Sequence, residues 1–147
     1  MHRSRVAALG FAFGLCGPAI GQGFGTPEAA FAEHRQASRS RDIQRFLATI
    51  EFRQEALELL HRETGAAGPS DSAVAERAAA REAELKLRLE TKGFAPATID
   101  ACEIVNKWED SPDQVRFPVV CNSPSGSASF AVRVMRFAHG WRVVRGR

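Results

Sequence analysis

The spacing of apolar residues divides this chain into two parts. Between Thr26 and Lys92 apolar side chains recur every three or four positions, which is the period of a helix with one buried face. After Pro96 they recur at every second position, which is the period of a strand that buries one face. The pattern predicts an α+β fold in which N-terminal helices pack on an antiparallel sheet.

Capping and loop residues set the ends of the helices. Thr26, Pro27 and Glu28 form a typical helix start, with a capping hydroxyl, a proline in the first turn and an acid beside it. A loop that contains Gly and Pro, at 65–70, separates the third helix from a long charged one. The predicted helices span about 26–38, 43–50, 52–64 and 72–91.

Turn-forming residues divide the second part into four strands, at Thr98–Trp108, Gln114–Cys121, Ser127–Phe137 and Trp141–Arg145. Short connections imply an antiparallel meander. One register gathers the large apolar side chains on a single face. Between the first two strands it pairs Ile104 with Val119, Asn106 with Phe117 and Trp108 with Val115. Between the next two it pairs Val119 with Phe130, Phe117 with Val132 and Val115 with Val134. In the last hairpin a His139-Gly140 turn pairs Ala138 with Trp141 and Arg136 with Val143.

The first 21 residues have the three-part pattern of a secretory signal peptide. A short basic start precedes an apolar run, which small residues end at Gly21. We therefore predict a signal peptide at 1–21 and one exported domain, periplasmic or secreted, at 22–147. Cleavage after Gly23 is an alternative.

Two other interpretations of this leader are weaker. A membrane anchor is disfavoured because the apolar run covers about fifteen residues and a spanning helix needs about twenty. A lipid anchor on Cys16 is disfavoured because Leu15 stands where that signal needs a small residue. We expect no stable membrane span after cleavage.

The charge balance does not suggest a nucleic-acid partner. The chain holds 20 Lys and Arg against 17 Asp and Glu, and two of the arginines lie in the leader. The exported domain is therefore almost neutral, without the basic excess of nucleic-acid-binding domains. Arginines do gather near the C-terminus. We interpret them as a solvated strand face, and a site for an anionic partner is the alternative.

Two cysteines, Cys102 and Cys121, remain after cleavage. An even pair in an exported protein predicts a disulfide. Because the cysteines helped to set the register, that register is not independent proof of the bond. Two buried free thiols are the alternative.

The order of these elements resembles exported bacterial proteins of the nuclear-transport-factor-2-like superfamily, in branches with domains of unknown function. The resemblance rests on Thr26–Ala30, Arg41–Ile43, the Phe52-Arg53 segment, Ser125–Phe130 and Gly140–Val144. It implies that the four-stranded meander is curved and wraps around the helices as a cone with an interior cavity. The enzymes among these relatives, such as ketosteroid isomerase, use a tyrosine, and this chain contains none. No catalytic residue is therefore carried over.

The sequence contains no grouped catalytic or metal-binding set. His34 and His61 belong to separate predicted helices, and His139 belongs to a turn, so no metal and no cofactor are predicted. Glu51, Glu55 and Glu58 share one helical face, which we interpret as solvated. The serines at 125–127 are explained as turn residues.

The inner face of the cone is the remaining candidate site. The predicted cavity lining consists of Asn106, Trp108, Phe117, Val132, Arg136 and Trp141. An aromatic hollow with few polar groups is typical of a small-ligand pocket, but a plain core has the same features and is the interpretation that we favour for these residues. We predict a non-catalytic binding protein that holds a small apolar molecule or an envelope protein. The alternatives are an enzyme, a hydrolase or isomerase, in the same cavity, or an inhibitor or immunity-type protein. The oligomeric state is not predicted.

Overall fold

The structure is a computed structural model that describes residues 22–94 and 102–146. The predicted leader at 1–21 lies outside the described residues, and so do residues 98–101 of the first predicted strand.

Helices fill the N-terminal part and strands the C-terminal part, as the apolar periods predict. The helices are α1 (Pro27–Arg39), α2 (Ile43–Ala48), α3 (Phe52–Thr64), the short η1 (Gly65–Ala67) and α4 (Asp71–Lys92). The strands are β1 (Cys102–Ile104), β2 (Trp108–Ser111), β3 (Gln114–Ser123), β4 (Gly126–Phe137) and β5 (Gly140–Val144). Side-chain oxygens of Thr26, Asp42 and Ser70 cap α1, α2 and α4.

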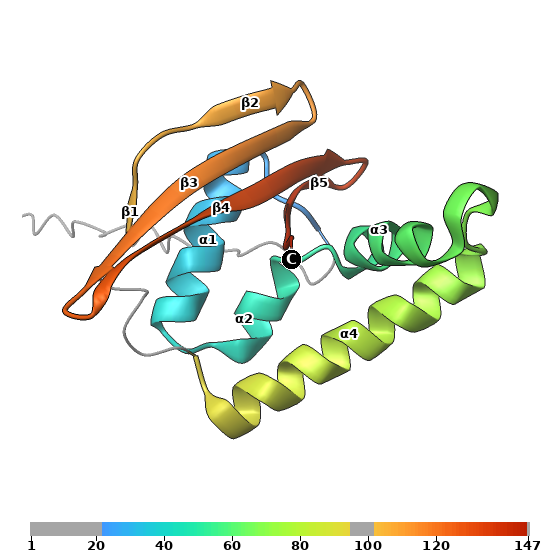
Figure 1. Ribbon diagram of the computed structural model, residues 1–147, viewed down its shortest axis with the longest axis horizontal. Helices are drawn as coiled ribbons and strands as arrows, with labels where there is room; N and C mark the ends of the chain where they lie inside the picture. The colour runs from blue at the N-terminus through green and yellow to red at the C-terminus, as the bar shows by residue number, and fades with distance from the viewer. Residues whose placement is uncertain (1–21, 95–101, 147) are drawn as a thin grey trace, which may run out of the picture.

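The strands form one antiparallel sheet in the order β1-β3-β4-β5, with β2 also paired to β3. Helix α1 lies beneath this curved sheet, while α3 and α4 lie beside one another beyond its β5 side (Figure 1). One hydrophobic core joins the sheet to α1, and a second joins α2, α3 and α4. The predicted α+β fold with helices packed on an antiparallel sheet is therefore confirmed.

The predicted pairing of the central strands is also confirmed. Cys102 pairs with Cys121 across β1 and β3. Across β3 and β4, Phe117 pairs with Val132 and Val119 with Phe130. Phe117 and Val119 are buried, and Phe117 stacks on Phe31 of α1 at 4.7 Å between ring centres. This face of the sheet is therefore the one that α1 covers.

The single first strand predicted at 98–108 is wrong, because the chain leaves the sheet between β1 and β2. Val105 donates its N–H to the carbonyl of Pro118, but proline has no N–H to return. The ladder stops there, and the Asn106 side chain accepts from the N–H of Lys107. When pairing resumes, Trp108 lies opposite Arg116 instead of Val115. A shift of one residue turns every side chain to the other face.

The predicted pairing of the last hairpin is displaced by two residues. Phe137 pairs with Gly140, and Arg136 with Trp141, so that Ala138 and His139 form the turn. Gly140 stands in the strand because the backbone of Gly23 passes against it, at 2.8 Å from the place of a Cβ. A displacement of two keeps each side chain on its predicted face.

The free edge of β5 is covered by two N-terminal segments. Phe24 exchanges two backbone hydrogen bonds with Trp141. The N–H of Val143 donates to Thr49 O, and the N–H of Glu51 donates to Val143 O. These contacts hide an edge that could otherwise pair with another chain.

The prediction of two solvated faces is wrong for Glu55 and Glu58 of α3, because arginines from the C-terminal strands pair with both. Glu58 accepts from Arg133 at 2.6 Å. Glu55, which is buried, accepts from the backbone and side chain of Arg145. The Glu51 carboxylate accepts from Nε2 of His139 at 3.0 Å. Arg142 and Val144 of β5 are also buried.

Candidate ligand-binding pocket

A pocket of about 170 Å3 opens between α1 and the β1 end of the sheet. Its walls combine aromatic and aliphatic side chains with a few polar groups from α1. The lining residues are Phe31, His34, Arg35, Ser38, Phe46, Cys102, Val119, Phe130 and Val132. Apolar walls with a few convergent polar groups are typical of sites for small molecules.

His34 lines this pocket, and a hydrogen bond fixes one of its two ring nitrogens. Its Nδ1 lies 2.6 Å from the hydroxyl of Thr49, and that hydroxyl lies 2.7 Å from the carbonyl of Phe46. Thr49 has one proton, which donates to the carbonyl, so the other contact requires Nδ1–H to donate to Thr49. Nε2 then carries the lone pair. Nε2 has no hydrogen-bond partner among the described residues. It is also accessible to solvent, because the only side-chain nitrogen of these residues that is both buried and unpaired is Nε of Arg142.

Burial keeps the His34 ring neutral. Removal from water, followed by the charge of Arg145, lowers the pKa of His34 to about 3. The ring also stacks on Phe46 at 4.3 Å between centres, which fixes its plane. His34 is therefore an oriented hydrogen-bond acceptor throughout the physiological pH range.

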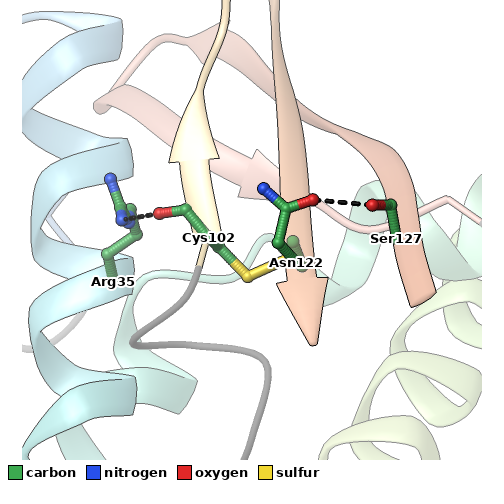
Figure 2. The surroundings of a disulfide bond; sticks show 5 residues. Arg35, Cys102, Asn122 and Ser127 are labelled. Carbon is green, nitrogen blue, oxygen red and sulfur yellow. Dashed lines mark hydrogen bonds between the residues drawn. A yellow bond between two sulfur atoms is a disulfide. The ribbon is translucent and has the colours of Figure 1, made fainter. Parts of the chain in front are cut away.

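The disulfide forms part of the wall of the pocket. Cys102 and Cys121 are bonded, with 4.0 Å between their Cα atoms. Hydrogen-bonded and non-hydrogen-bonded pairs alternate along an antiparallel ladder. Val105 and Pro118 form a hydrogen-bonded pair, so the cysteine pair three positions away is non-hydrogen-bonded. Side chains lie closer together in such a pair, which suits a disulfide. Figure 2 shows Arg35 of α1 reaching this strand, where Nη2 donates to the carbonyl of Cys102 at 2.9 Å. Beyond the bond, the Ser127 hydroxyl donates to Asn122.

The residues predicted to line a cavity do not meet in one place. Val132 lines the pocket, and Phe117 lies in the core next to it. Trp141 packs at the β5 side, and the side chain of Arg136 is exposed and paired with Asp113.

Asn106 and Trp108 are exposed, so their predicted inward orientation is wrong. The strand break after Val105 moves Trp108 to the outer face, where the guanidinium of Arg116 lies 5.1 Å from the ring centre. The proline in β3 was the signal for this break.

Sequence reasoning missed the polar members of the pocket, His34 and Arg35. His34 shares a helical face with Ala30 and Phe31, both of which are buried. A histidine on the apolar stripe of a helix was therefore the available signal. Its partner Thr49 lies fifteen residues further along, and no sequence pattern joins the two.

Two other hollows are larger but less suited to an apolar ligand. One, of about 480 Å3, lies between the start of α3 and the β4–β5 turn, and the other, of about 510 Å3, lies between α2 and the end of α4. Charged side chains stand in both, among them Glu51, Arg53, Asp71, Arg88 and Lys92. We interpret them as grooves between packed helices.

Two findings concern the described parts of the chain as a whole. Within 22–94 and 102–146, no three His, Cys, Asp or Glu side chains are grouped so that they could hold a metal ion. In the same residues, no helix has the length and apolar character needed to cross a bilayer.

Comparisons with known proteins give one structural similarity. No family model matches the chain, and no curated protein matches it. The chain is similar to a crystal structure described as a "Putative NTF2-like transpeptidase" from Campylobacter jejuni. The TM-score is 0.40 and the identity 15%, over 82% of this chain and 100% of that chain. A likeness of this degree carries no argument about family or activity.

Proposed function

We propose that this protein binds a small apolar molecule in the pocket between α1 and the sheet. The observation that carries the proposal is the Nε2 atom of His34, which has no partner in the described part of the chain, while Thr49 holds the ring in place at an apolar wall. Such a nitrogen accepts a hydrogen bond, so the ligand offers a hydroxyl or N–H group to it.

The size of the pocket limits the ligand. About 170 Å3 is close to the ~150 Å3 of an engineered apolar cavity that binds benzene. Phe31 and Phe46 provide aromatic surface on the helix side, and Phe130 provides it on the sheet side. These walls fit one substituted aromatic ring or a short aliphatic chain.

The electrostatics of the pocket favour binding over catalysis. A general base works best when its pKa is near the working pH, and the pKa of His34 is lowered to about 3. Such a weak base removes protons poorly at neutral pH. The same neutral ring remains a good acceptor, which supports a binding role.

Two aromatic probes of nearly equal size test the proposal. Phenol carries a hydroxyl donor and toluene does not. The ratio of their dissociation constants, measured by NMR titration, therefore gives the contribution of the hydrogen bond to His34. We expect phenol to bind more tightly by about 5- to 10-fold, the effect of one hydrogen bond of about 1 kcal/mol. Chemical-shift changes should centre on His34, Phe46 and Val132.

Variants of two histidines make the test specific. His34→Phe removes the acceptor and should abolish the preference for phenol over toluene. His61→Phe alters an exposed histidine of α3 and should leave the preference intact. If neither probe binds the unaltered protein at millimolar concentration, the binding proposal is wrong.

We also propose that residues 1–21 direct export and are then removed. The Cys102–Cys121 disulfide supports this proposal, because such bonds persist in oxidising compartments. The hydrogen bond from Gly23 N–H to His139 O, at 2.7 Å, favours cleavage before Gln22 over cleavage after Gly23. Sequencing of protein recovered from the periplasm or medium should begin at Gln22, and a chain that begins at Met1 would contradict export with cleavage.

A further inference from the structure

Arg35 brings a positive charge to the pocket without a negative partner. No ion pair joins it to a carboxylate within the described residues, in contrast to Arg133 and Arg145, which pair with acids of α3. Its Nη2 donates to the carbonyl of Cys102, which is a neutral group. Among the residues that the structure describes, the charge of Arg35 is therefore not compensated by a carboxylate.

Several donors of the Arg35 guanidinium remain available. A guanidinium has five N–H donors, and the carbonyl of Cys102 uses one. The other nitrogens have no acceptor among the described residues, yet they are not sealed from solvent. The ring of Phe31 lies 5.8 Å from the guanidinium carbon and limits its movement. The guanidinium is thus held at the pocket wall with N–H donors that no described residue uses.

The surroundings of Arg35 disfavour its charge. Burial, followed by the charge of Arg39 one turn along α1, lowers the pKa of Arg35 below its ordinary value. A bound anion would reverse both effects by supplying opposite charge and hydrogen-bond acceptors. Arg is suited to this role because its planar fork matches the two oxygens of a carboxylate.

We propose that the ligand of this pocket is a small apolar carboxylate, whose charged group binds Arg35 while its hydrocarbon part lies against the aromatic walls. This inference rests on the proposed function and adds the chemical class of the ligand. A ligand that also carries a hydroxyl group would satisfy His34 as well.

Benzoate and benzyl alcohol separate the charge from the ring. They share the aromatic group, and at pH 7.5 benzoate carries a charge while benzyl alcohol does not. Calorimetric or NMR titration of the unaltered protein gives both dissociation constants. Replacement by Arg35→Gln, which removes the charge but keeps a donor, should weaken benzoate binding about 10- to 100-fold and leave benzyl alcohol binding unchanged.

Two further variants complete the design. Arg35→Lys keeps the charge and should restore part of the benzoate affinity. Arg62→Gln removes an exposed charge of α3 and should change neither ligand. If Arg35 only supports the fold through Cys102, both ligands will weaken together in Arg35→Gln, and the carboxylate proposal is overturned.

The remaining outcomes distinguish this inference from the proposed function. If benzyl alcohol binds but Arg35→Gln leaves benzoate affinity as it was, the pocket stands and the carboxylate assignment is wrong. If neither molecule binds the unaltered protein, both proposals are wrong.

Discussion

Substitution of Glu55 by Gln should destabilise the protein strongly, because this buried carboxylate is the shared partner of two partly buried arginines. The side chain of Glu55 is 2% exposed, and those of Arg81 and Arg145 are each 24% exposed. Oε1 accepts from the backbone and side chain of Arg145 at 3.0 and 2.9 Å. Oε2 accepts from Arg145 at 2.9 Å and from Arg81 at 3.2 Å.

The size of the effect follows from what Glu55→Gln leaves behind. The amide keeps the volume of the carboxylate but turns one acceptor into a donor that faces guanidinium groups. Breaking a buried ion pair from one side costs about 3–5 kcal/mol, because the remaining charge stays buried without compensation. That is a large part of the 5–15 kcal/mol typical of a whole domain.

Urea unfolding followed by circular dichroism measures this loss in the free energy of unfolding. Urea is uncharged, so it does not screen the ion pairs under test. Glu63→Gln is the matched control, because Glu63 pairs with Arg77 at 3.1 Å with side-chain exposures of 47% and 37%. An exposed pair of this kind should cost less than about 1 kcal/mol.

The reasoning would be refuted if Glu55→Gln cost no more than this exposed control. Should Glu55→Gln not fold at all, Arg81→Gln provides a milder test. It removes one donor to Glu55 and should cost about 1–3 kcal/mol.

Three further predictions concern stability. Reduction of the disulfide, which closes a separation of 19 residues, should lower the free energy of unfolding by about 3 kcal/mol in urea, and an unchanged midpoint would mean that the bond contributes nothing. The His34 pKa is lowered to about 3 in the folded protein, whereas an unfolded histidine titrates near 6.5. The unfolded chain therefore takes up this proton first, so stability is fully present above pH 6.5 and is lost as pH falls toward 3. His34→Gln should flatten that slope by up to about 1.4 kcal/mol per pH unit, and His61→Gln should not. Gly23→Ala should cost about 1–3 kcal/mol, because its Cβ would stand 2.6 Å from the backbone of Gly140, whereas Gly25→Ala meets open space and should cost less than about 1 kcal/mol in thermal melts.

The fold was predictable because apolar period, caps and turns all indicate the same elements. Val74, Ala78, Leu85 and Leu89 recur at helical spacing along the charged helix, and all four are buried. The errors in the sheet arise from contacts between distant segments. The displaced β4–β5 turn depends on the approach of Gly23, which nothing within the hairpin sequence reveals.

The pocket was less predictable because its polar groups gain their roles only through packing. His34 and Thr49 come from different elements, and the tautomer of the ring depends on the carbonyl of Phe46. The buried acids of α3 were missed for a related reason. Glu55 has the sequence surroundings of a solvated residue, and only the return of β5 brings Arg145 to it.

The state of the His34 ring tests the central claim most directly. A long-range proton–nitrogen correlation spectrum at pH 7 distinguishes protonated from unprotonated ring nitrogens, with the assignment taken from His34→Gln. The account predicts that His34 carries its proton on Nδ1, that Nε2 is unprotonated, and that added phenol shifts the Nε2 signal. A charged ring, the opposite tautomer or an Nε2 signal whose chemical shift stays unchanged on addition of phenol would contradict it.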